Sequence, residues 1–455
     1  MALASVIKLS ELEGARRIDA EYYQPKYLSW MRTLKKGEYK FLEEKAFVTD
    51  GIHNSIDYDP ESGIRCFSAQ YVKDNYFDLS GNTFISHRQH KLNLRTSLKK
   101  GDVLISSVGT IGNAAVITED LLPANADRHV GIIRLKQTSS IDSYFLCAFL
   151  NSKFGKFETF REATGNVQLN LFIEKIKRLV IPGIGNREIF SSKVKLAIDL
   201  LRKSKSLYSQ AEKLLLEGLG LKDFKPKYEL SYTANLSKAF EAHRVDAEYF
   251  QPTYHELIEY LNTKFELKPL GKLLLDFQKG IEVGSENYEE EGKPFIRVSN
   301  LSVSGLVERD QKYLNEELYQ QLKDIYEPKI GESLLTKDAT PGIAYVVKES
   351  IQGIISSGIL KLSINESEIN EEYLALCINS IIGRLQVERD GGGSVITHWR
   401  PEQIKKLQIP ILSNDRQQQI ALLVQQSHEA KRRAKELLEE AKRKVEHMIE
   451  TASLN

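Results

Sequence analysis

Hydrophobic and small residues recur every three or four positions in two segments of the chain, 190–218 and 420–448. Steps that alternate between four and three are typical of a coiled-coil seam, since they keep one stripe of the helix facing its partner. The first segment holds this spacing throughout, and the second has one extra residue near its end, which favours a straighter helix there. The seam residues are Phe190, Val194, Ala197, Leu201, Ser204, Tyr208, Ala211, Leu215 and Gly218, then Ile420, Leu423, Ser427, Ala430, Ala434, Leu437, Ala441, Val445 and Met448.

Small residues are frequent in both seams, which allows two helix backbones to approach closely. Each helix could instead pack only on its own globular body, but two matching seams in one chain favour pairing with each other. A helix of ~33 residues is ~50 Å long. Because each helix follows a whole globular body, we expect antiparallel pairing with the bodies at opposite ends.

The segments before the helices, about 37–182 and 264–410, contain short apolar runs interrupted by Gly, Asn and Asp. This pattern predicts strand-rich, loop-rich bodies. Each body follows a short lead-in with a Gln-Pro step, and Pro25 and Pro252 suit the first turn of a helix.

The whole arrangement occurs twice. RRIDAEYYQPKY at 16–27 recurs as HRVDAEYFQPTY at 243–254, and IKRLVIP at 176–182 recurs as IKKLQIP at 404–410. The offset stays near 228 residues, which is much longer than the 20–50 residues of solenoid repeats. Each repeat is therefore the size of a domain.

Composition supports a folded chain of several domains. The chain has 455 residues, of which 41% are hydrophobic and 27% charged, which predicts two to four domains. No apolar run approaches the ~20 residues that span a bilayer, and the N-terminus lacks a signal-peptide pattern, so we expect a cytoplasmic protein. Cys66, Cys147 and Cys377 are far apart, which excludes a disulfide framework or a cysteine zinc site as an organising feature.

Charge is unevenly distributed between the two halves. Residues 1–227 contain 35 Lys and Arg against 26 Asp and Glu, and residues 228–455 contain 28 against 36. Bulk charge thus favours a polyanionic partner only for the first half, so an interaction with nucleic acid would depend on local patches.

Catalytic signatures are lacking in the sequence. It has no GxxxxGK[ST] loop, no GxGxxG after a strand, no HExxH, no GxSxG, and no Asn-Pro-Pro-aromatic step. His87 and His90 lack a third metal ligand nearby. Asp57, Asp59 and Glu61 are better explained as a solvated turn around Pro60 than as a nuclease site.

Basic and polar segments favour binding instead. ISHRQHKLNLRTSLKKG at 85–101 is a candidate phosphate-binding patch, although a solvated polar face explains it as well. Loops at 125–129, 164–170 and 394–400 carry donors and acceptors of the kind that read base edges in the major groove.

The chain resembles the specificity (S) subunit of type I restriction–modification systems over nearly its whole length. The most specific matches are DAEYYQPKY and DAEYFQPTY, the segment from Gly101 to Gly112, and the run ending in IKxLxIP before each helix. IPILSNDRQQQI resembles the Pro-rich step into the family's helix start, whereas IPGIGNREIF in the first repeat departs from it.

The resemblance implies an α+β fold with two tandem target-recognition domains separated by two long helices that form an antiparallel coiled coil. It places a first target-recognition domain at 1–186, the first helix at 187–221, a second target-recognition domain at 222–414 and the second helix at 415–455. Each domain would read one half of a split double-stranded DNA target, and the helices would set the spacing.

The resemblance also implies partners. Methyltransferase (M) subunits would dock on the helices and lead-in segments, and an ATP-dependent translocase and nuclease (R) subunit would join them. S-adenosylmethionine, ATP and Mg²⁺ are expected on those partners, with no cofactor, metal or catalytic residue in this chain. Alternatives are a specificity subunit of a related type II-like system, a structural adaptor that does not bind DNA, and an enzyme with an unrecognised nuclease or methyltransferase motif.

Candidate DNA contacts come from both bodies. In the first they are Ser68, Gln70, His87, Arg88, Lys91, Arg95, Thr110, Arg128, His129, Asn166 and Gln168, and in the second Arg297, Asn300, Lys337, Thr340, Ser394, Thr397, His398 and Arg400.

Overall fold

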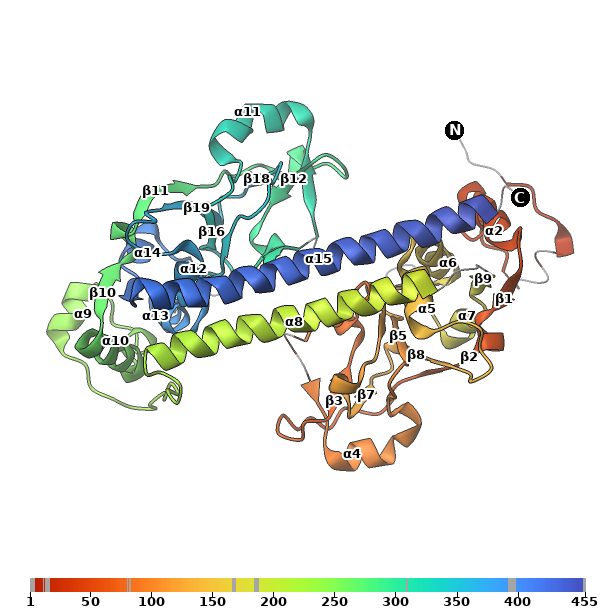
Figure 1. Cartoon of the computed structure of the whole chain (residues 1–455), viewed down its shortest axis with the longest axis horizontal. Helices are drawn as coiled ribbons and strands as arrows, with labels where there is room; N and C mark the ends of the chain where they lie inside the picture. The colour runs from red at the N-terminus through yellow and green to blue at the C-terminus, as the bar shows by residue number, and fades with distance from the viewer. Residues whose placement is uncertain are drawn as a thin grey trace. The chain divides into compact units, whose positions relative to one another are not determined.

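The computed structural model divides the chain into two compact units (Figure 1). Unit 1 comprises Met1–Leu201 and Arg432–Asn455, and unit 2 comprises Arg202–Lys431. The boundaries fall inside two long helices, α8 (Glu188–Gly218) and α15 (Asn414–Ala452), so each unit contains part of both. The structure describes residues 5–10, 12, 17–79, 81, 83–165, 169–183, 188–307, 310–391 and 398–452.

Unit 1 contains a four-stranded sheet in the order β2-β8-β5-β6, a three-stranded sheet in the order β4-β3-β7, and the pair β1-β9. Its strands are β1 Tyr39–Phe41, β2 Ala46–Asp50, β3 Arg65–Phe67, β4 Thr83–Phe84, β5 Val103–Ser106, β6 Ala114–Val116, β7 Ala124–Ala126, β8 Val130–Leu135 and β9 Val180–Pro182. Its shorter helices are α2 Pro25–Lys35, α3 Leu42–Lys45, α4 His87–Leu92, α5 Ser143–Asn151, α6 Lys153–Glu162 and α7 Ile173–Lys177.

Unit 2 contains sheets in the orders β11-β19-β16-β17 and β15-β12-β18, with the pairs β10-β20 and β13-β14. Its strands are β10 Glu266–Pro269, β11 Leu274–Lys279, β12 Lys293–Ile296, β13 Leu301–Ser302, β14 Gly305–Leu306, β15 Lys312–Leu314, β16 Ser333–Thr336, β17 Ala344–Val346, β18 Ile354–Ile355, β19 Ile359–Ile364 and β20 Gln408–Ile411. Its shorter helices are α9 Leu236–Ala242, α10 Pro252–Lys264, α11 Glu316–Tyr326, α12 Glu371–Asn379, α13 Ile381–Gly391 and α14 Pro401–Lys405.

The two units share one topology, which corresponds to the repeat in the sequence. In each, an antiparallel four-stranded sheet lies beside a three-stranded sheet that has one parallel and one antiparallel pair. Equivalent helices also begin alike: Asp142 accepts hydrogen bonds from the backbone at the start of α5, and Asn370 does so at the start of α12. Such side-chain caps satisfy backbone N–H groups that lack a partner within the helix. Pro25 and Pro252 open α2 and α10, as the sequence predicts.

Segments of the two long helices pack within the core of each unit. In unit 1, Val194 of α8 and Ala441 of α15 are fully buried in one hydrophobic cluster with Phe149 of α5. In unit 2, Leu215 of α8 and Ile420 of α15 are fully buried in the corresponding cluster. Each unit thus buries its own helix segments together with its sheet and shorter helices.

Most seam residues named from the sequence are buried, but at two of the positions predicted on α15 the next residue is buried instead. Val424 and Ile449 are buried, whereas the predicted neighbours Leu423 and Met448 are half-buried. A straight helix with 3.6 residues per turn drifts relative to a 3.5-residue repeat, so adjacent positions share the contact. Leu201 and Tyr208 of α8 are also half-buried and pack against the cores. Buried seam residues are Phe190, Val194, Ala197, Ser204, Ala211, Leu215, Ile420, Ser427, Ala430, Ala434, Leu437, Ala441 and Val445.

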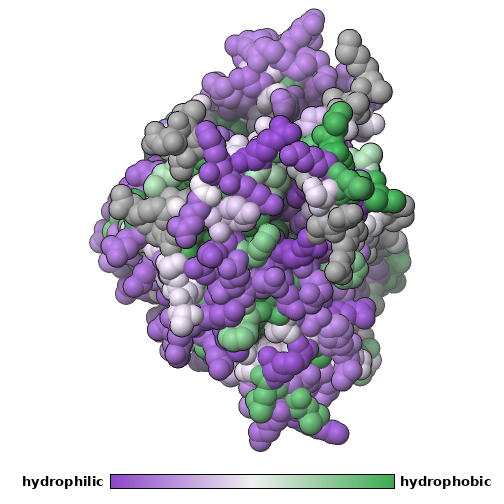
Figure 2. All heavy atoms as spheres, turned by 90° about the vertical axis from the view of Figure 1, so that its right-hand side faces the viewer, coloured by the Kyte–Doolittle hydropathy of each residue, from purple (hydrophilic) through white to green (hydrophobic). Residues whose placement is uncertain are grey.

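Across the residues that the structure describes, no helix is both long enough and apolar enough to span a membrane. The face drawn in Figure 2 is mostly hydrophilic, and hydrophobic residues appear on it in small separate groups.

Candidate nucleic-acid interface

A backbone corner of the same construction follows the parallel strand pair of each unit. In unit 1, Phe67 of β3 lies opposite Ala126 of β7, and the N–H of Asp127 donates to the Phe67 carbonyl at 2.9 Å. In unit 2, Ile296 of β12 lies opposite Ile355 of β18, and the N–H of Ser356 donates to the Ile296 carbonyl at 2.8 Å. The residues that follow these strands therefore occupy equivalent corners.

A third chain segment crosses each corner at a glycine. A Cβ on Gly51 would lie 2.1 Å from the Ala126 carbonyl oxygen, and one on Gly280 would lie 2.3 Å from that of Ser356. Only glycine permits this close approach of two backbones. The crossing fixes both corners, so their side chains project from a rigid frame.

The unit 2 corner, which we call the Arg297 corner, consists of Arg297, Asp310, Ser356 and Ser357. Arg297 directly follows β12, and its Nη2 donates to the Asp310 carboxylate at 2.8 Å and also to the Asp310 carbonyl oxygen. Lys312 lies 3.2 Å from the other carboxylate oxygen. Hydrogen bonds from Arg297 and then Lys312 hold the pKa of Asp310 below its ordinary value, so this carboxylate is charged at neutral pH.

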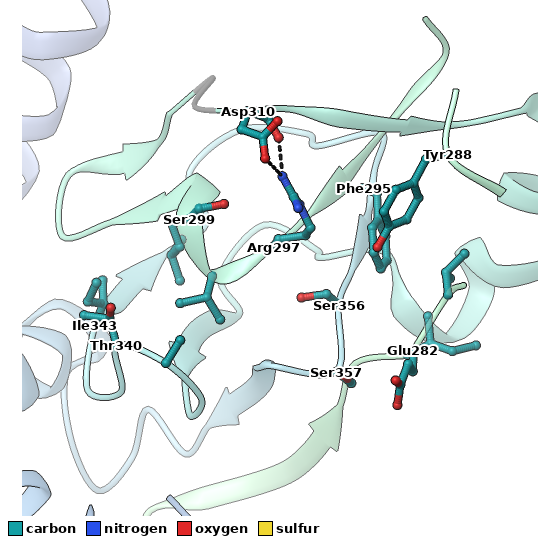
Figure 3. A pocket seen from close by; sticks show the side chains of 15 residues that line it. Glu282, Tyr288, Phe295, Arg297, Ser299, Asp310, Thr340, Ile343, Ser356 and Ser357 are labelled. Carbon is teal, nitrogen blue, oxygen red and sulfur yellow. Dashed lines mark hydrogen bonds and ion pairs between the residues drawn. The ribbon is translucent and has the colours of Figure 1, made fainter. Parts of the chain in front are cut away.

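Arg297 projects into a pocket of about 950 Å³. Figure 3 shows its side chain reaching toward Asp310, with the rings of Tyr288 and Phe295 on one side and Ser299 on the other. Ser356 lies beneath the guanidinium in this view. The pocket thus combines apolar walls with one oriented cation.

The unit 1 corner, which we call the Arg128 corner, carries Ser68, Asp127, Arg128 and His129. Asp127 accepts a hydrogen bond from the His129 backbone at 2.9 Å, and its other oxygen lies 3.3 Å from the His129 ring. Arg128 is exposed and its Nε lies 3.3 Å from His129 Nε2. The same frame therefore presents different side chains in the two units.

Helix α4 presents the basic segment predicted from the sequence. His87, Arg88 and Lys91 are exposed along it, and Arg95 follows in the next turn. Arg95 is held by Thr49 Oγ1 and lies 3.6 Å from Asp50. A helix with an exposed basic face is suited to contact with phosphates.

The turn that joins the last two strands of each four-stranded sheet exposes a threonine, Thr110 between β5 and β6 in unit 1 and Thr340 between β16 and β17 in unit 2. Thr336 Oγ1 donates to the Thr340 carbonyl at 2.6 Å, which closes the turn in unit 2. Ser106 makes the equivalent bond to Thr110. Gln70 is exposed near the Arg128 corner, at a 3₁₀ turn that follows β3.

Lys337 and His398 meet at one carboxylate in unit 2. Asp338 lies 2.5 Å from Lys337 Nζ and 2.8 Å from His398 Nδ1. Burial raises the pKa of Asp338, but the hydrogen bonds from Lys337 and His398 outweigh it and lower the pKa overall. The backbone N–H of the buried Trp399 donates to the Lys337 carbonyl at 2.8 Å, which fixes His398 beside the turn of Thr340.

The comparisons with known proteins identify the domain that contains the Arg297 corner. Residues 262–442 match the family described as the type I restriction modification DNA specificity domain. This part of the chain is therefore similar to the DNA specificity domain of type I restriction–modification systems. The resemblance recognised in the sequence is thereby confirmed for this part of the chain, and so is its predicted role in DNA specificity.

Solved structures that match the chain include two specificity subunits. The S subunit of a type I restriction–modification system from M. genitalium is 14% identical, with 91% of this chain and 95% of that chain covered and a TM-score of 0.43. The HsdS subunit from Thermoanaerobacter tengcongensis is 14% identical, with 91% and 96% covered and a TM-score of 0.28. None of the curated protein sequences matches the chain.

One candidate contact in this part of the chain, Asn300, is buried, whereas another, Arg400, is exposed. Asn300 is only 1% exposed; its Oδ1 accepts from the Arg297 backbone at 3.1 Å and its Nδ2 donates to the Val307 carbonyl at 3.2 Å. It therefore braces the Arg297 corner, and its amide is not available to a base edge. Arg400 is exposed at the start of α14, where its backbone N–H donates to Gln403 Oε1 at 3.1 Å.

Asn166, Gln168, Ser394 and Thr397 lie outside the described residues. The corners also contain residues that the sequence did not single out. Asp310 is 13 positions from Arg297 and belongs to no local motif, and Ser356 reaches the corner only through the β12·β18 pairing. Extending the repeat alignment through the corners would have paired Ser356 with Asp127.

The repeated lead-in motif has a structural role in both units. Arg17 pairs with Asp19 at 2.7 Å, and its Nη1 donates to the carbonyls of Arg161, Glu162 and Ala163 at the end of α6. In unit 2, Arg244 pairs with Asp246 and donates to the Asp390 carbonyl in the last turn of α13 at 2.9 Å. A cation at a helix C-terminus complements the helix dipole, so the motif anchors the lead-in to the body.

The structure shows no clustered metal ligands in the described parts of the chain, where no three His, Cys, Asp or Glu side chains come together to hold an ion. Cys66, Cys147 and Cys377 are all buried and unbridged, and burial raises the pKa of each thiol. Buried thiols of raised pKa are poor nucleophiles.

Proposed function

We propose that the chain is the S subunit of a type I restriction–modification system and that each unit reads one half of a bipartite DNA target. The observation that carries this proposal is the repeated corner. Both units have the same strand order and the same backbone frame, whereas the side chains on that frame differ between the Arg128 corner and the Arg297 corner. One frame with two sets of side chains fits two half-sites of different sequence.

In this proposal the globular parts of 1–186 and 222–414 are target-recognition domains, and α8 and α15 form an antiparallel coiled coil that sets the spacing between them. Contacts inside unit 2 support the antiparallel direction, because Ser204 lies against Ser427 while Gly218, later in α8, lies near Leu412, just before α15. A helix of ~50 Å corresponds to about 15 base pairs at about 3.4 Å per step.

The partners follow from the same proposal. Methyltransferase subunits would bind S-adenosylmethionine and modify the target, and an ATP- and Mg²⁺-dependent translocase and nuclease subunit would cleave DNA. The chain itself would contribute recognition and no catalysis, in the cytoplasm. The buried cysteines and the structural use of the lead-in arginines, Arg17 and Arg244, agree with this division of labour.

The test is a base-resolution map of N6-methyladenine in the source genome, with the gene present and deleted. The proposal expects a two-part motif with a fixed gap that disappears on deletion and returns on complementation. A map that does not change, while the partner genes are expressed, would favour the structural adaptor or the enzyme with an unrecognised motif.

A further inference from the structure

We propose that Arg297 reads a guanine in the half-site bound by unit 2, with Asp310 holding the guanidinium in the reading orientation. This inference rests on the proposed function, and it assigns a base and a residue that the family match does not give.

The geometry fixes Arg297 at both ends. Its backbone follows Ile296, which is 1% exposed and paired with β18, and its own N–H is bound by the buried Asn300. Its Nη2 is bound by Asp310 at 2.8 Å. Yet 26% of the Arg297 side chain is exposed, so the guanidinium remains accessible from the pocket.

An oriented guanidinium fits a base edge better than a phosphate. Guanine presents O6 and N7 side by side in the major groove, and a planar arginine fork can donate to both. A phosphate needs only a positive charge, and the neighbouring carboxylate of Asp310, whose side chain is 64% exposed, would repel it. The same carboxylate can accept from the N4 amino group of the paired cytosine.

The pocket leaves room for such an edge. Tyr288 and Phe295 form an apolar wall beside Arg297, and Ser356 and Ser357 lie below it (Figure 3). A wrong base would leave a donor of this guanidinium without its partner, which costs the free energy of desolvating that group.

The assignment is specific to unit 2. The position equivalent to Arg297 in the Arg128 corner is Ser68, which also directly follows its strand. The unit 1 corner instead carries Arg128 beside Asp127, after β7, which is the other strand of the parallel pair. A change at Arg297 should therefore alter one half-site and leave the other intact.

The experiment expresses Arg297→Gln, Arg297→Lys and Asp310→Asn with the native partner subunits in a strain lacking the wild-type gene, and maps methylated adenines. The half-site of unit 2 is the one that persists when residues 37–182 are replaced by another body. Arg384→Gln is the matched control, since Arg384 is an exposed arginine on α13 paired with Glu388.

We expect Arg297→Gln to change or relax one guanine position of that half-site, with about tenfold to hundredfold loss of discrimination. Arg297→Lys keeps the charge and should relax the same position, Asp310→Asn should relax it less, and Arg384→Gln should leave the motif unchanged. If Arg297→Gln does not assemble with its partners, Arg297→Lys decides the result.

An unchanged motif in assembled Arg297 variants would overturn the inference, as would a half-site without guanine or a loss of methylation spread evenly over all positions. These results would leave the proposed function intact. A wild-type map without any two-part motif would instead refute the proposed function itself.

Discussion

Ser427 of α15 donates its hydroxyl hydrogen to the backbone carbonyl of Ser204 on α8, 2.7 Å away, and the two hydroxyls lie 3.0 Å apart. Both serines are buried within unit 2. Two polar side chains satisfy each other where the helices are close, so the contact fixes the register of the helix segments and not only their proximity.

Replacing Ser427 by Ala should destabilise unit 2 by about 1 kcal/mol, since a buried hydrogen bond is lost while the small side chain keeps the helices close. Replacing it by Leu should cost about 1–3 kcal/mol more because of overpacking. Urea unfolding measures both, and Ser209→Ala on the exposed face of α8 is the control. Equal stability of the Leu variant and the wild type would contradict the close approach.

We expect the stability of unit 1 to depend on pH through the buried carboxyl group of Glu158. The side chain is buried on α6, where it accepts hydrogen bonds from the Val180 N–H at 3.0 and 3.1 Å. Burial raises its pKa to about 8, against 4.5 for the ordinary value. The folded state therefore holds a proton that the unfolded state releases, and the stability from this group is present below pH 4.5 and declines as pH rises to about 8.

Glu158→Gln keeps the acceptor oxygen and removes the titration. The variant should gain stability relative to the wild type between pH 5 and pH 8, by about 1.4 kcal/mol per pH unit. Urea unfolding across that range measures the difference. A difference between variant and wild type that stays constant with pH would show that Glu158 is ionised in the folded state.

The pair of Lys348 and Glu372 in unit 2 allows the cost of leaving a buried charge unpaired to be measured as a loss of stability. Its Nζ lies 2.8 Å from the fully buried Glu372, which in turn lies 4.0 Å from His428 of α15. Lys348→Met should destabilise the unit by about 3 kcal/mol, because removing one partner of a buried pair leaves the other uncompensated. The double variant Lys348→Met, Glu372→Gln should recover part of this loss in thermal unfolding. No recovery would mean that the lysine acts only through packing.

We expect Lys91 to contribute to the salt dependence of DNA binding. The side chain is exposed on α4 beside Arg88. If it contacts a phosphate, Lys91→Ala should lower the slope of log K against log salt by about one unit, with little change in sequence preference. Fluorescence anisotropy with the assembled complex and its mapped target measures the slope. Lys177→Ala, which removes a lysine paired with Glu174 on α7, should not change it.

The sequence predicted the helices better than the site. The heptad spacing and the internal repeat predicted where the long helices lie, because the buried face of a helix appears in the sequence as a regular spacing of hydrophobic residues. The sequence did not predict the burial of Val424 and Ile449, because a straight helix drifts relative to the heptad repeat and brings the residue next to the predicted one into the buried face.

The corners were harder to predict, because they depend on strand pairing and loop paths. Arg297 was selected from the sequence, but its partner Asp310 is 13 residues away and meets it only through the loop before β15. Asn300 was selected as a contact and is instead buried as a brace of the same corner. Residue type indicated polarity at these positions, and only the fold shows which polar groups remain available to a base.

A methylation map after exchange of one body tests whether the two units read their half-sites independently. Residues 37–182 would be replaced by the corresponding segment of another specificity subunit, and the chimera expressed with the native partners. We expect one half of the motif to change while the other half and the gap length stay the same. A motif that changes in both halves, or in neither, would contradict independent reading by the two units.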